Sequence, residues 1–334
     1  MPNQKYFMQL QAEGRLVNPE AVPAAECRRL FYGATYLLDY IADTTGITDD
    51  LRHCFGSIGE EILSLAYYLV LEEGQPMNRF RKWGITHKHP YGEDIPSQRC
   101  NEIFGMITED LKTEYCKRRA KRHGSGKYLI FGTTSVSSYS HLTRQVKYGE
   151  NEEGDLLPQI NLALLYREES MLPVYYRELP GSSTGVKTIE ELVKDIDFPE
   201  LEKLNFVTGS GCFVPVSNEV KEPVESSRIY QAKDFIEKSF NNLKERLDMR
   251  RMSVSSEENF EGKLFVQFIA LELLSYIKKQ MDNKGLFKNY TIQSLLDELD
   301  VIECYQQPGK AHHLSEITEK QRKIYEALSV PVPT

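Results

Sequence analysis

The sequence predicts a mixed α/β (α+β) fold, in which an all-α amino-terminal domain precedes a mixed sheet with flanking helices. Apolar residues recur at helical spacing over the first third of the chain, whereas alternating β-branched and aromatic residues follow the Gly-containing junction His123–Gly126. Helical patterns return from Ile229 onward. We therefore predict three parts: 1–123 helical, 124–260 built around the sheet, and 261–334 as carboxyl-terminal helices and a tail.

Composition sets outer bounds on this prediction. The chain has 334 residues, of which 40% are hydrophobic and 27% charged, so it is long enough and apolar enough to fold into more than one domain. The net charge of −8 would repel phosphate, so any nucleic-acid binding must depend on a local basic patch. The longest apolar run, Leu264–Ile277, is too short to cross a bilayer and predicts a buried helix. We expect a cytoplasmic protein without a membrane partner.

The amino-terminal part is predicted to be helical from about Ala24 to Arg122. Its apolar stripes are formed by Leu30, Tyr36, Leu37 and Tyr40, and then by Ile62, Leu65, Ala66 and Leu69. The Pro-containing stretch His87–Pro96 interrupts the pattern, because proline disfavours helical backbone in the residue before it. A further helix is expected from Ser97 into a basic run.

Four strands are predicted in the middle part. They are Lys127–Phe131, a strand through Ile160, Leu162 and Leu164, Leu172–Leu179, and Asn205–Thr208. The polar break Glu168–Ser170 suits a hairpin between the second and third strands, and Thr188–Ile196 has helical spacing. This order of strands and helices predicts a mixed sheet with helices packed on it.

A helix beginning near Tyr230 places four functional side chains on one face. At about 100° per residue, Tyr230, Lys233, Glu237 and Lys244 fall within an arc of about 60°. An amphipathic helix with a solvated charged stripe would show the same pattern. The helix alone therefore leaves both a structural and a functional interpretation open.

Four segments taken together carry a family resemblance. They are Ala34–Asp39 with Leu63–Leu69 and Pro96–Arg99, then Thr133–Ser138 as the end of a first strand, then Gln159–Leu165 with Leu172–Gly181, and the helix from Tyr230. This combination resembles the bacterial insertion-sequence-four-type transposases of the three-carboxylate (DDE) class, whose helix signature is Tyr, Arg, Glu and Lys. Lys233 stands in the position of the Arg.

The resemblance implies a ribonuclease H-like core and DNA-mediated transposition, with DNA end binding, cleavage and strand transfer. Such enzymes hold two Mg²⁺ ions with an Asp after the first strand, an Asp after the fourth and a helical Glu. Glu237 matches the third acid, whereas Gly132 and Gly209 stand where the two Asp are expected. Glycine has no carboxylate, so we predict no intact metal site, no productive Mg²⁺ binding and a catalytically defective copy.

The family's insertion domain is also expected to be missing or truncated. Only Ser210–Ile236 separates the second vacated position from the Glu helix, and this segment is short, polar and Pro-containing. In the family, this region helps to bind the transposon end. Its shortening therefore adds to the expectation of a defective enzyme.

DNA contact without cleavage is predicted from a basic cluster at the end of the helical part. The candidate DNA-binding residues are Lys117, Arg118, Arg119, Lys121 and Arg122, with Tyr230, Lys233 and Lys244 of the later helix. A solvated helix end followed by a linker is the alternative. The expected partners are double-stranded DNA of the transposon ends and a second copy of the chain. Two alternatives would share these features: a non-catalytic DNA-binding or dimerising protein derived from a transposase, and a folded relic without function. DNA binding that depends on salt but not on metal would identify the first of them.

Overall fold

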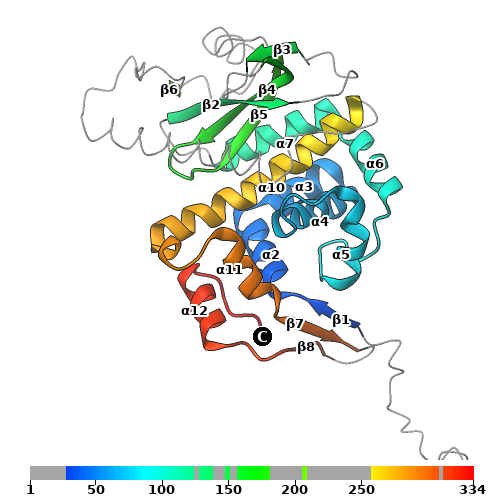
Figure 1. Ribbon diagram of the computed structural model, residues 1–334, viewed down its shortest axis with the longest axis vertical. Helices are drawn as coiled ribbons and strands as arrows, with labels where there is room; N and C mark the ends of the chain where they lie inside the picture. The colour runs from blue at the N-terminus through cyan, green and yellow to red at the C-terminus, as the bar shows by residue number, and fades with distance from the viewer. Residues whose placement is uncertain are drawn as a thin grey trace, which may run out of the picture.

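The computed structural model describes residues 28–123, 128–137, 147–150, 156–180, 205–208, 257–307 and 311–334. Figure 1 shows a larger sheet at one end of these residues, a helical layer in the middle and a small sheet at the other end. The described part of the chain is therefore α+β, as the sequence predicts.

The described helices form the middle layer. They are α2 (Gly33–Thr45), α3 (Ile47–Phe55), α4 (Ile58–Leu71), α5 (Phe80–Thr86), α6 (Ser97–Met106), α7 (Glu109–Arg122), α10 (Glu257–Lys284), α11 (Ile292–Asp300) and α12 (Glu319–Ala327), with short 3₁₀ turns at Met77–Arg79 and Leu286–Lys288. Local sequence explains several boundaries. Gly46, with φ of 76°, ends α2 in the left-handed conformation that glycine adopts without strain. Thr291 and Thr318 begin α11 and α12 with capping boxes.

The larger sheet is mixed. It contains β2 (Tyr128–Ser137), β3 (Lys147–Glu150), β4 (Leu156–Arg167), β5 (Pro173–Pro180) and β6 (Asn205–Thr208). β4 is antiparallel to β2 on one edge and to both β3 and β5 on the other, whereas β2 and β6 are parallel. The four predicted strands and the hairpin turn at Glu168–Ser170 are confirmed, and β3 is an additional strand.

Helices α7 and α10 pack against this sheet through β5. α10 confirms the buried helix predicted at Leu264–Ile277, and its Gln267 and Glu272 are also buried. Where α10 crosses α6, a Cβ at Gly262 would overlap the backbone of Phe104. Glycine at this position therefore permits the close approach of the two helices.

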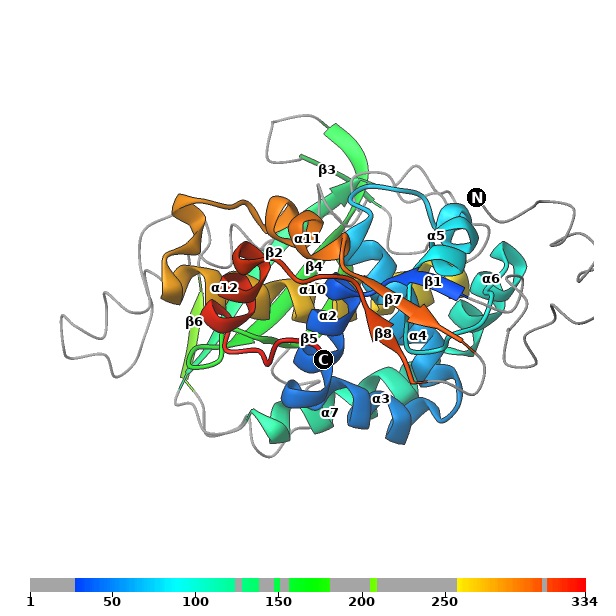
Figure 2. The same cartoon turned by 90° about the horizontal axis from the view of Figure 1, so that it is seen from below.

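The small sheet joins the two ends of the described chain. It consists of β1 (Arg28–Phe31), β7 (Glu303–Gln306) and β8 (His313–Leu314), in the order β1-β7-β8 (Figure 2). The prediction that the helical pattern begins at about Ala24 and includes Leu30 is wrong, because Leu30 lies in β1 opposite Cys304. A strand this short takes its conformation from its partner strand, which lies far away in the sequence.

One continuous core of buried residues joins the helical layer, the larger sheet and the carboxyl-terminal helices. The buried Tyr325 hydroxyl of α12 donates to the carbonyl oxygen of Gly33 in α2 at 2.8 Å, and Val330 in the tail is buried. The predicted boundary at residue 123 coincides with the change from α7 to β2. Among the described helices, none has the length and apolar character needed to span a membrane.

Candidate functional site

The first candidate site is the centre of the larger sheet. Gly132 is buried within β2, and its Cα partner on β4 is Leu164. We predicted a strand at Lys127–Phe131, with Thr133–Ser138 as the end of the first strand, and β2 ends at Ser137 because its pairing with β4 extends that far. Position 132 therefore lies inside a central strand.

The neighbouring strand β6 ends one residue before a second predicted position, Gly209. β2 and β6 run parallel, and their described register ends with Phe131 opposite Thr208. Gly132 follows Phe131 in the sequence, and Gly209 follows Thr208. Gly209 itself and the helix residues Tyr230, Lys233, Glu237 and Lys244 lie outside the described residues.

The second candidate site is the basic cluster of α7, and three of its arginines converge on one carboxylate. Asp50 of α3 is 1% exposed. It accepts hydrogen bonds from Arg122 at 2.9 and 3.0 Å, from Arg118 at 3.2 Å and from Arg119 at 3.3 Å. Burial by itself would raise the pKa of Asp50, but the guanidinium groups of Arg122 and Arg119 more than offset it and hold the pKa below its usual value.

Arg119 is the innermost of these cations. Its side chain is fully buried, donates to the carbonyl oxygen of Thr45 at 2.7 Å and forms an ion pair with Glu272 of α10 at 2.9 Å. Burial raises the pKa of Glu272 to about 7, and Arg119 opposes that shift. The buried Tyr115 hydroxyl donates to the same carboxylate at 3.2 Å. Arg119 therefore holds α3, α7 and α10 together and cannot reach a DNA phosphate in this fold.

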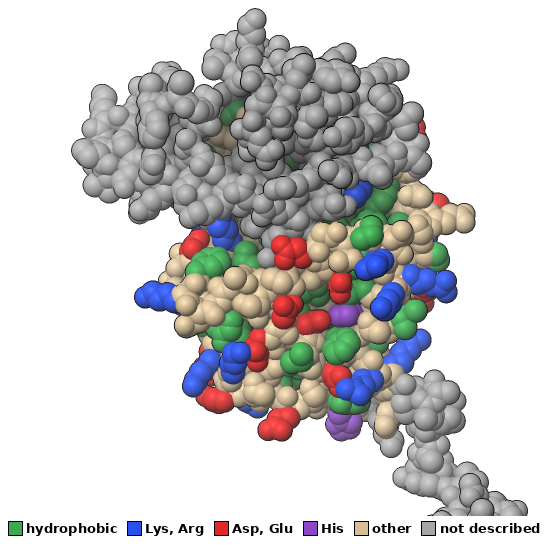
Figure 3. Space-filling view, viewed as in Figure 1, with side chains coloured by type: hydrophobic (Ala, Val, Ile, Leu, Met, Phe, Trp, Pro, Cys, Tyr) green, Lys and Arg blue, Asp and Glu red, His purple; other side chains and the backbone are tan. Residues whose placement is uncertain are grey.

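The other cations of the cluster are more accessible. About a third of the Arg118 and Arg122 side chains is exposed, Lys121 is exposed and Lys117 is half-buried. Lys and Arg side chains are interspersed with Asp and Glu over the face of the molecule in Figure 3. DNA binding by Lys117, Arg118, Lys121 and Arg122 stays a prediction.

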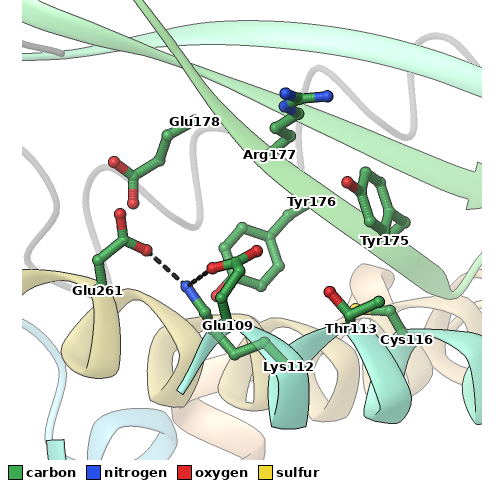
Figure 4. A pocket seen from close by; sticks show the side chains of 9 residues that line it. All are labelled: Glu109, Lys112, Thr113, Cys116, Tyr175, Tyr176, Arg177, Glu178 and Glu261. Carbon is green, nitrogen blue, oxygen red and sulfur yellow. Dashed lines mark hydrogen bonds and ion pairs between the residues drawn. The ribbon is translucent and has the colours of Figure 1, made fainter. Parts of the chain in front are cut away.

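A third site was not predicted from the sequence: a cavity of about 300 Å³ between α7, β5 and α10, which we call the charged pocket. Its lining residues are Glu109, Lys112, Thr113, Cys116, Tyr175, Tyr176, Arg177, Glu178 and Glu261 (Figure 4). The buried Lys112 ammonium lies 2.6 Å from a carboxylate oxygen of Glu109 and 2.6 Å from one of Glu261. Burial, and then the nearby Glu261 carboxylate, raise the pKa of Glu178 to about 9.

A cluster of aromatic rings and histidines lies around α5. The rings of Trp83 and His87 stack at 4.5 Å, and His87 Nε2 lies 3.1 Å from the carboxylate of Asp300. His89 lies 3.0 Å from the Ser64 hydroxyl, and burial lowers the pKa of His89 to about 4. Ser64 donates to the carbonyl oxygen of its own helix and accepts from the Tyr91 amide. Its hydroxyl is thus committed to structural hydrogen bonds rather than free to act as a nucleophile.

No group of three or more His, Cys, Asp or Glu side chains with metal-binding geometry occurs in the described part of the chain. The sequence of this protein matches no model of a known protein family. It also has no significant match among curated proteins. Any function proposed for this chain must therefore be argued from its own residues and from the arrangement of its strands.

Proposed function

We propose that this chain is a transposase-family protein for DNA-mediated transposition that binds transposon-end DNA but is catalytically defective. The observation that supports this most strongly is the parallel pairing of β2 with β6, the first and fourth of the strands predicted from the sequence. Acids on two neighbouring strands lie close enough to share a pair of ions, and the parallel direction places the residues that follow Phe131 and Thr208 at equivalent positions.

The register supports the positions as well as the strands. Each described pair of β2 and β6 has the same sequence separation as Gly132 and Gly209. Adjacent strands lie about 4.8 Å apart, so two aspartates at these positions would be within reach of ions roughly 4 Å apart. Glycine at both positions supplies no carboxylate oxygen. The proposed defect is thus the loss of two of three metal ligands, with Glu237 as the remaining acid.

Cleavage and strand-transfer assays test the catalytic part of the proposal. The purified chain is incubated with Mg²⁺ and a DNA duplex that contains the ends flanking the reading frame. It should give no more cleavage product than the Glu237→Gln variant under the same conditions. Cleavage that Glu237→Gln abolishes would contradict the proposed defect.

Restoring the acids gives a sharper test. The double variant Gly132→Asp with Gly209→Asp should bind Mn²⁺, measured by electron paramagnetic resonance, whereas either single variant should bind it at least tenfold more weakly. Circular dichroism checks that each variant is folded, because position 132 is buried. A folded double variant that binds Mn²⁺ no better than the single variants would show that these positions do not share a site.

Binding of the DNA ends is tested separately. Mobility shifts should show binding that weakens with salt and persists in the presence of a chelator, because phosphate contacts release counterions whether or not a metal is bound. Lys121→Gln should reduce the slope of log affinity against log salt by about 0.9 if Lys121 contacts one phosphate. Lys323→Gln on α12 is the control, since Lys323 is also exposed and lies on another element. Binding that is insensitive to salt would contradict this part.

A further inference from the structure

The charged pocket contains more acid than its cations neutralise. Glu109, Glu178 and Glu261 surround one buried ammonium, that of Lys112. Figure 4 shows the carboxylates of Glu178 and Glu261 pointing toward each other, while the guanidinium of Arg177 points away from them. Among the residues that the structure describes, the pocket therefore has no second positive charge near Glu178.

Two buried polar groups of the pocket receive no N–H donor from the described part of the chain. Tyr176 is 8% exposed, and its hydroxyl is one of them. The carboxyl group of Glu178 is the other, because its hydrogen-bonding neighbour is the carboxyl group of Glu261 and not a cation. Buried polar atoms of folded proteins are nearly always hydrogen-bonded, because each unmet group costs about 1–3 kcal/mol. Tyr176 and Glu178 both line the same cavity, so one occupant could satisfy both.

The chemistry of the lining restricts the occupant. An anion would be repelled by the surplus carboxylates, and the Lys112 ammonium is already held by two of them. A cavity of about 300 Å³ is much larger than a bare metal ion and lies at the lower end of the range for small-molecule sites. An ammonium group offers three N–H donors, and tyrosine rings also attract organic cations.

We propose that the charged pocket binds a small organic ammonium compound, whose N–H groups donate to Glu178 and Glu261 and whose carbon chain packs against Tyr175 and Tyr176. A cation bound beside Glu178 would favour the ionised carboxylate and so lower the pKa that burial and Glu261 raise. Binding at pH 8 should therefore release up to one proton per site. This inference does not depend on DNA binding or on the vacated positions of the sheet.

Isothermal titration calorimetry of the full chain with 1,4-diaminobutane at pH 8 tests the proposal. We expect one site per chain and a heat that changes between Tris and phosphate buffers, as proton release requires. Glu178→Gln should weaken binding at least tenfold, and Tyr176→Phe should weaken it several-fold. Glu114→Gln, on the exposed face of α7, should leave the affinity unchanged.

Three results would overturn the proposal: no saturable binding of the diamine, equal affinity in Glu178→Gln when its thermal unfolding matches that of the parent chain, or an identical loss in Glu114→Gln. Magnesium chloride is the competing probe. If Mg²⁺ alone binds at the pocket with a Glu178-dependent heat and excludes the diamine, the site is a metal site and the ammonium assignment is wrong.

Discussion

Replacing Asp50 with alanine should destabilise the fold strongly, because it leaves buried cations without their shared partner. Asp50 is 1% exposed and accepts from three arginines, and Arg119 would retain only the Thr45 carbonyl and Glu272. Removing one member of a buried ion pair costs about 3–5 kcal/mol. Arg118 and Arg122 are partly exposed and can turn toward water when Asp50 is absent. The loss of their ion pairs with Asp50 should therefore add little to the destabilisation.

Asp49 provides a matched control, because it precedes Asp50 in the same first turn of α3. Its side chain is 67% exposed and lies 3.8 Å from Arg52, which is 61% exposed. Exposed pairs of this kind contribute about 0–1 kcal/mol. The two neighbouring acids should therefore differ by at least about 2 kcal/mol in their effect on the free energy of unfolding.

Urea unfolding measures the difference, followed by far-ultraviolet circular dichroism and by the fluorescence of Trp83, the single tryptophan. Asp50→Asn, which keeps the shape of the side chain, replaces Asp50→Ala if the alanine variant does not fold. A double-mutant cycle of Asp50→Asn with Arg122→Gln isolates one pair. Equal destabilisation by Asp49→Ala and Asp50→Ala would refute the assignment of Asp50 as the centre of a buried network.

The remaining predictions also concern stability. Gly262→Ala should cost about 1–3 kcal/mol or more, since the new Cβ overlaps backbone of α6, whereas Gly105→Ala has open space and should be neutral or slightly stabilising; thermal melts compare the two. Tyr325→Phe should cost about 0.5–1.5 kcal/mol by removing the hydrogen bond from the buried hydroxyl to the Gly33 carbonyl, as measured by urea unfolding. Burial lowers the pKa of His89 to about 4, so the native state binds fewer protons than the unfolded chain between pH 6.5 and 4. The free energy of unfolding should therefore decrease as the pH is lowered from 6.5 to 4, by about 3 kcal/mol for His89 if the full shift is expressed. His89→Gln should make the free energy of unfolding less dependent on pH in this range.

Much of the larger sheet could be predicted because its strands have local signals. Asn205–Thr208 contains the aromatic Phe206 and the β-branched Val207 and Thr208, and the structure places β6 at those residues. Alternation through Ile160 and Leu164 likewise identified β4. By contrast, β1 could not be predicted, since Arg28–Phe31 extends only because Glu303–Gln306 lies beside it. Pairing between such distant segments has no local sequence signature.

The basic cluster illustrates the same difficulty at a site. A run of cations at a helix end predicts a solvent-facing patch, yet Arg119 is fully buried because acids from two distant helices face it. One signal was present: Glu272 interrupts an otherwise apolar helical run, and a carboxylate there requires a buried partner. The charged pocket had no comparable signal, because Glu178 and Glu261 come from separate elements whose contact only the fold creates.

The hydrogen bond between Tyr325 and Gly33 spans 292 residues of chain. At about 5–20 residues per second, a ribosome needs roughly 15–60 s between the two. During that time the apolar face of α2 lacks the helix that finally seals it. Nascent chains should therefore be most vulnerable to aggregation and proteolysis, and most dependent on chaperones, until Tyr325 has been synthesised and has packed on α2.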